Sequence, residues 1–252
     1  MDLKENARRG IYLLPNLFTL ASLFVGFYAI VAALDGYYEN SAIAIFIAMV
    51  LDGLDGRVAR LTNTMTVFGA EFDSLVDMVA FGVAPALLMY EWALSNLDKI
   101  GWLTAFIYIA AVALRLARFN TQIGVVNKRY FQGLSCTAGA GVIAGIVWLG
   151  KELAVEQHSI ALGLAFLTVI VGILMVSNIR YRSFKDLEFK DHVPFLSILL
   201  TVFIVVLISL EPAKVLFSIF AIYAISGPVA TIWALRKRRK LRREIQKKTV
   251  RS

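Results

Sequence analysis

Long stretches of almost purely apolar residues recur along this chain, and short polar connectors separate them. The stretches run for roughly 17 to 23 residues each, and a helix rising about 1.5 Å per residue needs about 20 residues to cross a bilayer core. The pattern therefore predicts an all-α, polytopic membrane bundle of about eight transmembrane helices. These helices are expected over residues 13–34, 41–60, 69–90, 100–118, 134–150, 159–178, 193–210 and 213–235.

The overall composition agrees with a membrane location. Of the 252 residues, 59% are hydrophobic and 17% are charged, whereas soluble domains average about half and a quarter. No polar block between the expected helices is long enough for a separate water-soluble core. We therefore expect one membrane domain over residues 1–235 and a basic tail over residues 236–252. Cys136 is the single cysteine, which excludes an intrachain disulfide.

Lysines and arginines fall almost entirely on one side of this expected topology. With the N-terminus inside, all 26 of them except Lys99, Lys151 and Lys214 lie in cytoplasmic connections or in the tail. Cytoplasmic loops are enriched in these residues, so the distribution predicts that both termini are cytoplasmic. Because the basic tail directly follows an apolar stretch, contact with anionic membrane lipids is favoured over binding of nucleic acid.

Four carboxylates interrupt this apolar chain within the stretch LDGLDGRVARLTNTMTVFGAEFDSLVD. Asp52 and Asp55 are three residues apart, and Asp73 and Asp77 are four apart, so each pair shares one face of a helix. The connector of eight residues between the two helices, 61–68, allows them to run antiparallel. The spacing therefore predicts that all four carboxylates gather at the cytoplasmic end of the second and third helices.

Such a cluster needs compensation, because ionised groups at membrane depth are costly unless they are paired. Protonation, pairing with Arg57 or Arg60, and binding of divalent cations are the three possibilities. Ligand sets made only of carboxylates suit Mg²⁺, Mn²⁺ or Ca²⁺ rather than zinc. Glycines beside the aspartates allow a ligand to approach the backbone, although small residues also pack membrane helices together. A metal site with a nearby arginine indicates a phosphorylated substrate.

The motif Asp52-x-x-Asp55-Gly56-x-x-Ala59-Arg60, followed after eight residues by Gly69-x-x-x-Asp73-x-x-x-Asp77, resembles the complete signature of the CDP-alcohol phosphotransferase family. The resemblance implies a membrane-embedded helical bundle, usually a homodimer, with a dinuclear Mg²⁺ or Mn²⁺ site. It also implies transfer of a substituted phosphoryl group from a CDP-linked donor to an alcohol, with release of CMP.

By this resemblance Asp52, Asp55, Asp73 and Asp77 would be the metal ligands, and Asp77 would also act as the base on the attacking hydroxyl. The resemblance further implies a site for the CDP and pyrophosphate of the donor, formed by Asn16, Thr19, Gly56, Ala59, Arg60 and Gly69. Residues 16 and 19 have a competing interpretation as helix-capping residues.

Five further stretches, LLPNLFTL, FGVAPA, LRLARFN, FQGL and LMVSNIRYRSFK, resemble the branch of the family that transfers a phosphatidyl group from CDP-diacylglycerol to L-serine. Serine carries a carboxylate, which arginine recognises through paired hydrogen bonds, although arginines flanking membrane helices also set topology. The candidate acceptor residues are Arg115, Arg118, Asn120, Gln132 and Arg182. We expect an enzyme of phospholipid biosynthesis in the cell membrane, with its active site facing the cytoplasm.

Two alternatives follow from the same residues. Glycerol 3-phosphate or inositol phosphate could replace serine as the acceptor, because the core motif is common to the whole family. A divalent-cation transporter is the alternative from another class of protein, since carboxylates inside membranes also mark ion pathways. Finally, Gly141-x-x-x-Gly145 predicts close helix packing, either within the bundle or at a dimer interface.

Overall fold

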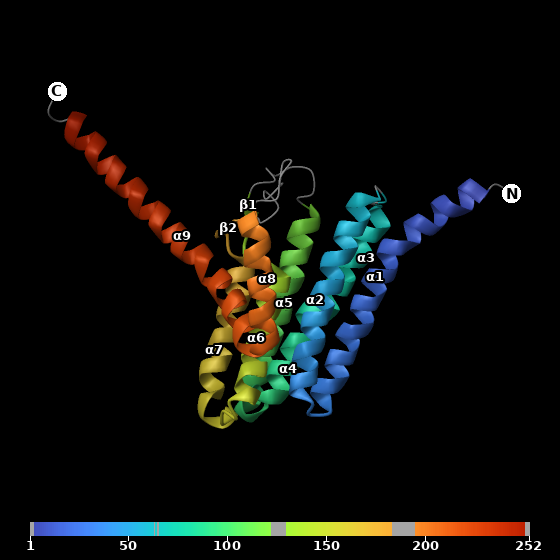
Figure 1. The fold of residues 1–252 in the computed structure, drawn as a ribbon. Helices are drawn as coiled ribbons and strands as arrows, with labels where there is room; N and C mark the ends of the chain where they lie inside the picture. Colours follow the sequence, from blue (N-terminus) through green and yellow to red (C-terminus); the bar gives the residue numbers. More distant parts are fainter. Residues whose placement is uncertain (1–2, 63, 65, 122–129, 183–194, 250–252) are drawn as a thin grey trace.

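The computed structural model describes residues 3–62, 64, 66–121, 130–182 and 195–249. Over these residues the chain forms a bundle of long helices that lie side by side (Figure 1). The elements, in chain order, are α1 (Leu3–Leu34), α2 (Tyr38–Leu61), α3 (Val67–Asp77), the π-helical turn η1 (Met78–Val83), α4 (Ala84–Trp92), the 3₁₀ turn η2 (Leu94–Leu97), α5 (Asp98–Thr121), β1 (Tyr130–Gln132), α6 (Cys136–Glu152), α7 (Gln157–Val176), β2 (Arg180–Arg182), α8 (Phe195–Leu210) and α9 (Pro212–Thr249).

A helical segment overlaps each of the eight ranges predicted from the sequence, with α3, η1 and α4 together forming the third. Residues 193–194 of the predicted seventh range and 250–252 of the predicted tail lie outside the described residues. Within the described part, five helices are long and apolar enough to cross a membrane, and α2, α6 and α8 are not among them. Charged side chains near its end lower the hydropathy of α2, and α6 has only 17 residues. The structure is thus a helical membrane protein, and eight crossings stay a prediction.

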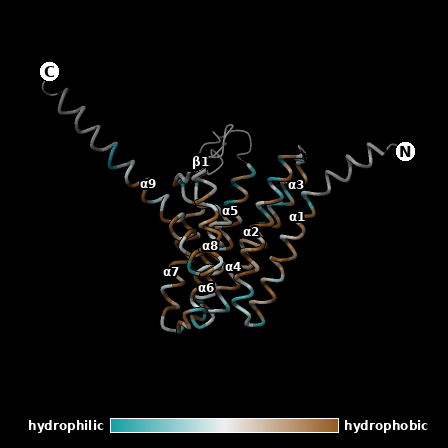
Figure 2. The backbone as a smooth tube through the Cα atoms, in the orientation of Figure 1, coloured by the Kyte–Doolittle hydropathy of each residue, from teal (hydrophilic) through white to brown (hydrophobic). Residues whose placement is uncertain are grey.

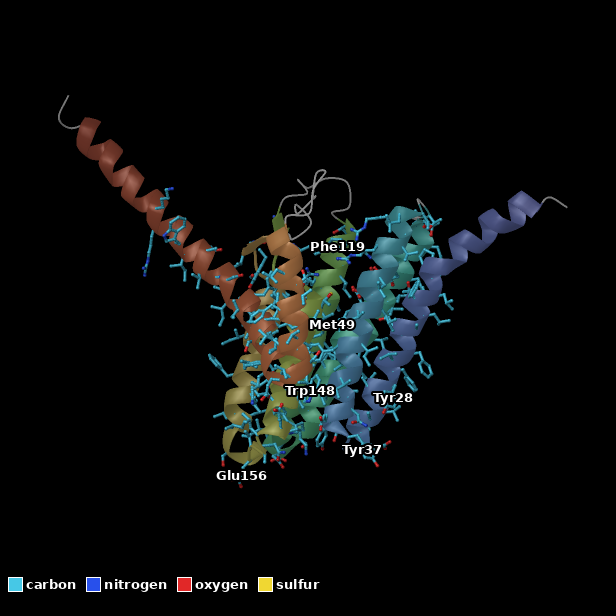
Figure 3. All side chains as sticks on the ribbon, in the orientation of Figure 1. Tyr28, Tyr37, Met49, Phe119, Trp148 and Glu156 are labelled. Atoms are coloured by element: carbon cyan, nitrogen blue, oxygen red, sulfur yellow. The ribbon has the colours of Figure 1, made fainter. Side chains whose placement is uncertain are left out.

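Both ends of the chain lie at the same end of the bundle, where α2 ends and α3 begins (Figure 1). Tyr37 and Glu156, which precede α2 and α7, lie at the opposite end from Phe119 near the end of α5 (Figure 3). Lys99, Lys151 and Lys214 are the three lysines predicted to lie on the non-cytoplasmic side, and two of them have partners at this opposite end. Lys214 forms an ion pair with Glu211 at 2.9 Å, and the Lys151 ammonium lies 5.7 Å from the centre of the Tyr38 ring.

The predicted all-α bundle carries one short element that the sequence did not predict. Strands β1 and β2 pair antiparallel in a two-stranded ladder, with Phe131 opposite Tyr181 and Gln132 opposite Arg180. Each strand has only three residues, which is too short for a periodic pattern to reveal in sequence. The ladder joins the chain before α6 to the chain after α7, at the end of the bundle where α2 ends and α3 begins (Figure 1).

Small residues allow the helices to approach closely in the apolar middle of the bundle (Figure 2). A Cβ atom added to Gly26 of α1 would lie 2.8 Å from the Ala80 side chain of η1. Gly141 and Gly145 of α6 form pockets for the α9 side chains Phe220 and Phe217, and a Cβ at Gly141 would lie 2.5 Å from the Phe220 ring. The Gly-x-x-x-Gly motif therefore packs within the bundle, against α9.

The FGVAPA stretch distorts the third helical segment. Pro85 has no N–H to donate to the carbonyl of Phe81 four residues earlier, and the π-helical turn η1 forms just before this proline. The freed carbonyl accepts a hydrogen bond of 3.1 Å from the hydroxyl of Tyr108 on α5, which is fully buried. A neighbouring helix thus satisfies the carbonyl that this proline leaves without a helical donor.

Candidate active site

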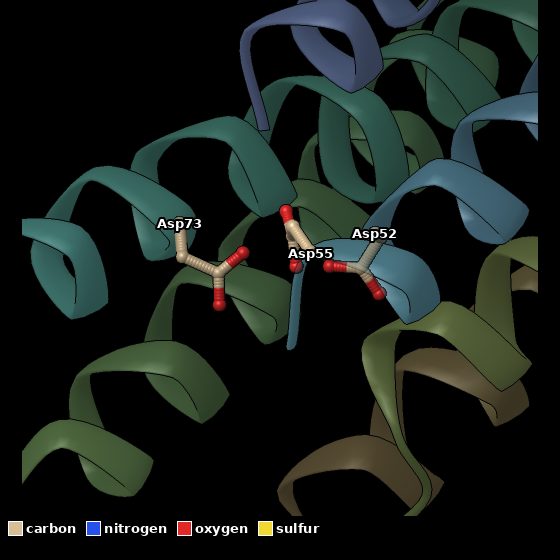
Figure 4. A group of neighbouring side chains, drawn as sticks. All are labelled: Asp52, Asp55 and Asp73. Carbon is tan, nitrogen blue, oxygen red and sulfur yellow. The ribbon is translucent and has the colours of Figure 1, made fainter. Parts of the chain in front are cut away.

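The last turns of α2 and the middle of α3 bring three carboxylates together. Oxygen atoms of Asp52, Asp55 and Asp73 lie within 4.8 Å of one another, and the three side chains gather around a common point (Figure 4). The start of α3 is fixed by Thr66, whose hydroxyl accepts a hydrogen bond of 2.9 Å from the N–H of Gly69. Sequence spacing alone placed these aspartates on facing helices, and the structure agrees with that placement.

Asp55 is the most buried member of this triad, with 6% of its surface exposed. The hydroxyl of Thr19 on α1 donates a hydrogen bond of 2.8 Å to Asp55 Oδ2 and also lies 3.1 Å from the carbonyl of Pro15. Thr19 lies in the middle of α1, not at its start, so its hydroxyl orients a carboxylate and does not cap the helix. Three helices therefore contribute to the cluster.

The charges of the triad have no protein counter-charge among the described residues. Arg57 and Arg60 are exposed, and no ion pair joins either side chain to an aspartate. Two unit charges about 4.8 Å apart repel by roughly 3.5 kcal/mol at an effective dielectric constant near 20. The sequence offered three ways to compensate these negative charges: protonation, pairing with arginine, and binding of divalent cations. Pairing with arginine is absent among the described residues.

The donor set fits a hard divalent cation. Oδ1 of Asp73 and Oδ1 of Asp77 are buried, and no hydrogen-bond donor reaches either atom within the described chain. Buried carboxylate oxygens without donors are costly, and a cation coordinated by oxygen removes that cost. The residues present therefore fit Mg²⁺ or Mn²⁺ better than zinc, which prefers nitrogen and sulfur ligands.

Asp77 lies beside the triad but is held differently. It ends α3, directly before η1, and lies one helical turn after Asp73 on the same helix face. Its Oδ2 accepts a hydrogen bond of 3.6 Å from the thiol of Cys136, at the start of α6. One oxygen is thus fixed by a weak donor, while Oδ1 has no donor among the described residues and can accept a proton or a metal ion.

Cys136 is the residue at this site that the sequence did not reveal. Its thiol is buried, and its contact with Asp77 joins positions 59 residues apart, which no local pattern encodes. Arg115 on α5 lies behind it: Nη1 is 3.9 Å from Cys136 Sγ, and Nε donates to the carbonyl of Leu134. Arg115 is 9% exposed, so it is an internal cation and does not lie at a membrane surface.

The other acceptor candidates are spread over the same end of the bundle. Arg118 is half-buried and donates hydrogen bonds to the carbonyl of Val176, 3.0 Å away, and to the side chain of Asn178, so it satisfies a backbone carbonyl at the C-terminal end of α7. Asn120 accepts from Ser74 at 3.2 Å and donates to Glu71 at 3.2 Å, which joins α5 to α3.

Two acceptor candidates lie on the strand ladder. Gln132 is exposed on β1. The backbone of Arg182 lies in β2, and its side chain is outside the described part of the structure. Arg115 and Arg118 are three residues apart on one face of α5, yet they contact different parts of the protein. Of these two arginines, Arg115 is the one that the described contacts connect to Asp77, through Cys136.

The residues expected to hold the donor surround an open face of α2. Atoms added at Gly53 or Gly56 would meet nothing within 4 Å, so these glycines leave space and do not pack against another helix. Ala59 is half-buried on the same helix, and Arg60 is exposed at its last turn. A Cβ at Gly69 would lie 3.6 Å from Asn16 Oδ1, which places Asn16 beside the start of α3.

Comparison with known proteins agrees with this geometry. Residues 12–180 match the family model for CDP-alcohol phosphatidyltransferase. A CDP-diacylglycerol–serine O-phosphatidyltransferase of Helicobacter pylori is 39% identical over 216 residues, which cover 85% of this chain and 90% of that protein. A protein of the same name from Methanocaldococcus jannaschii is 36% identical over 178 residues, covering 71% of this chain and 78% of that protein.

A third relative is named for a different lipid. The archaetidylserine synthase of Methanothermobacter thermautotrophicus is 33% identical over 172 residues, which cover 67% of this chain and 69% of that protein. The family match extends over most of the chain and includes α2, α3 and the whole acidic cluster. The chain therefore belongs to the CDP-alcohol phosphatidyltransferase family.

Proposed function

We propose that this protein transfers the phosphatidyl group of CDP-diacylglycerol to the hydroxyl of L-serine, forming phosphatidylserine and CMP. The observation that carries the proposal is the cluster of Asp52, Asp55 and Asp73 beside Asp77, at one end of an apolar bundle. There a lipid donor enters from the bilayer and a polar acceptor enters from water. The named relatives support serine as the acceptor, since serine is the part their names share.

Asp52, Asp55 and Asp73 would hold the divalent metal, with Asp77 completing a dinuclear site for Mg²⁺ or Mn²⁺. When bound, two such ions stabilise negative charge on the attacking and leaving oxygens of an in-line displacement. Thr19 holds Asp55 in place from α1, so the ligand set is oriented by a hydrogen bond before any ion arrives.

Asp77 is the proposed base. Its Oδ1 has no hydrogen-bond donor in the described chain, so this atom is available to accept the proton of the serine hydroxyl. The serine oxygen forms a bond to the lipid-linked phosphorus as the pyrophosphate bond to CMP breaks, and CMP leaves with the bridging oxygen. The Cys136 thiol keeps the other oxygen of Asp77 in a fixed orientation during this transfer.

The donor and acceptor would approach the acidic cluster from different sides. The open glycine face of α2, with Asn16, Arg60 and Gly69 around it, is the proposed site of the CDP group. Arg115, beyond Cys136, is the proposed partner of the serine carboxylate, with Arg118, Asn120, Gln132 and Arg182 as the remaining acceptor candidates. Glycerol 3-phosphate and inositol phosphate are the competing acceptors, since an arginine also binds phosphate.

The proposal includes a membrane topology. Eight crossings, with both termini and the acidic cluster on the cytoplasmic side, agree with the common end of the two termini and with the far-side position of Lys151 and Lys214. Residues 1–235 would form a single catalytic domain and residues 236–252 a basic tail on the lipid headgroups. A homodimer, which the family resemblance implies, completes the proposal.

Purified protein in detergent micelles, supplied with CDP-diacylglycerol, Mg²⁺ or Mn²⁺ and one acceptor at a time, would test it. CMP release should be stimulated by L-serine, and not by glycerol 3-phosphate or inositol phosphate. Stimulation only by a phosphorylated alcohol would refute the choice of serine while keeping the reaction. Uptake of Mn²⁺ into vesicles without CMP formation would instead favour a transporter, although the carboxylates lie at one end of two helices and not along a path through the bundle.

A further inference from the structure

Helix α9 carries a proline in its interior, Pro228, and its missing N–H leaves the carbonyl of Ala224 without its helical donor. The hydroxyl of Tyr181 donates a hydrogen bond of 2.9 Å to this carbonyl, across 43 residues of sequence. Tyr181 is 1% exposed and belongs to β2. A strand residue therefore completes the hydrogen bonding of the last helix.

The surface of α9 is shaped to receive this ring. A Cβ added at Gly227 would lie 2.4 Å from the Tyr181 ring, so only a glycine permits the contact. The neighbouring Tyr223 ring lies 5.5 Å from that of Tyr181, measured between centroids. Gly227, the freed carbonyl and Tyr223 together form a socket, which we call the α9 socket.

Tyr181 connects the α9 socket to the acceptor side of the site. β2 pairs with β1, which places Gln132 opposite Arg180 in the ladder. Directly after β1, the carbonyl of Leu134 accepts a hydrogen bond from Nε of Arg115. The strands and the buried arginine are thus linked to α9 through Tyr181. Both Tyr181 and α9 lie beyond the family match at residues 12–180.

We propose that the α9 socket and Tyr181 position the acceptor pocket, so that α9 sets the affinity for the acceptor without touching the metal-binding aspartates. The inference rests on the proposed function, in which Arg115 and the strand residues bind the acceptor. It assigns a role to the last helix, which carries none of the sequence motifs of the family. Tyr181 is a positioning residue and not a catalytic one.

Tyr181→Phe removes only the hydroxyl and is the first test. Loss of one buried hydrogen bond should raise the KM for L-serine by roughly five- to tenfold, while the KM for CDP-diacylglycerol stays within about twofold. Because the Ala224 carbonyl then lacks a donor, Tyr181→Phe should also lower the melting temperature. The double variant Tyr181→Phe/Pro228→Ala restores an N–H to that carbonyl and should recover the melting temperature.

The double variant separates positioning from stability. A KM for serine that stays raised after the melting temperature recovers supports the inference, and a KM that recovers with it overturns the inference. Gly227→Ala should also raise the KM for serine, because its methyl group displaces the ring. Gly163→Ala is the matched control, since a Cβ there meets nothing within 4 Å.

Failure of the inference is distinguishable from failure of the proposed function. If wild-type protein uses another alcohol, the KM is measured for that alcohol, and an unchanged KM in Tyr181→Phe overturns the positioning role alone. Independently of turnover, a spin label on Gln132→Cys in a Cys136→Ser background should gain mobility when Tyr181→Phe is added. Unchanged mobility would also count against the α9 socket as a support for the strands.

Discussion

The hydrogen bond from Thr19 to Asp55 should control how tightly the acidic cluster binds metal. Thr19→Val keeps the shape of the side chain and removes the hydroxyl that lies 2.8 Å from Asp55 Oδ2. Both residues are buried, with 4% and 6% of their surfaces exposed, so water cannot simply replace the lost donor. Asp55 should therefore lose its fixed orientation toward Asp52 and Asp73.

The size of the effect follows from the chemistry of this bond. A hydrogen bond to a charged group contributes about 1.5 to 3 kcal/mol, and 1.4 kcal/mol corresponds to a factor of ten in affinity. Removal of a side chain that orients a metal ligand typically weakens binding by about 10- to 100-fold. We therefore expect Thr19→Val to weaken Mn²⁺ binding by roughly 10- to 100-fold.

Mn²⁺ titration of the purified protein, followed by electron paramagnetic resonance of the free ion, measures this affinity directly. Thr168→Val is the matched control, because Thr168 is also buried and, within the described structure, its hydroxyl bonds only to the carbonyl of Leu164 in its own helix, at 2.8 Å. Thr19 makes the same kind of helix contact with Pro15, so the difference between the variants isolates the bond to Asp55. Equal Mn²⁺ affinities in the two variants would refute the role of Thr19.

Three further predictions concern the proposed reaction. Asp77→Asn should lower kcat by about 10²- to 10⁴-fold and leave binding of CDP-diacylglycerol nearly intact, since the proton acceptor is lost while the amide keeps one oxygen at the metal site; near-normal turnover would exclude Asp77 as the base. Cys136→Ala should lower kcat by roughly three- to tenfold because Asp77 loses its donor, and Cys136→Ser should recover most of it; equal kcat values would contradict this orienting role. Chelation by EDTA should abolish CMP release and lower the melting temperature, and Mg²⁺ or Mn²⁺ should restore both; activity that persists in EDTA would exclude a metal-dependent reaction.

The acidic cluster could be predicted from sequence because its geometry is almost entirely local. Spacings of three and four residues place each aspartate pair on one helix face, and a short connector brings the two faces together. The helical ranges were also predictable, because apolar stretches of this length have few other structures available to them in a bilayer. The far-side lysines follow from the same topology, and Lys151 and Lys214 meet their partners at that end.

The contacts around the cluster could not be predicted in this way. Cys136 meets Asp77, and Thr19 meets Asp55, only because helices distant in sequence pack together. The arginines at 115 and 118 look equivalent on a helical wheel, yet one is buried behind Cys136 and the other binds the end of α7. Residue type and spacing predict which groups share a face, whereas tertiary packing decides what that face meets.

Two prolines show how this packing is directed around the site. Pro85 frees the carbonyl of Phe81 just after Asp77, and Tyr108 satisfies it; Pro228 frees the carbonyl of Ala224 in α9, and Tyr181 satisfies that one. In each case a buried tyrosine hydroxyl from another element replaces the missing N–H, so a local defect becomes a specific contact between elements. The first contact fixes the helix that carries the proposed base, and the second fixes the strands on the acceptor side. The sequence identifies each proline and the carbonyl that it frees, but only the fold identifies the tyrosine that donates to that carbonyl. A substitution at Tyr181 therefore tests a contact that no sequence pattern reveals.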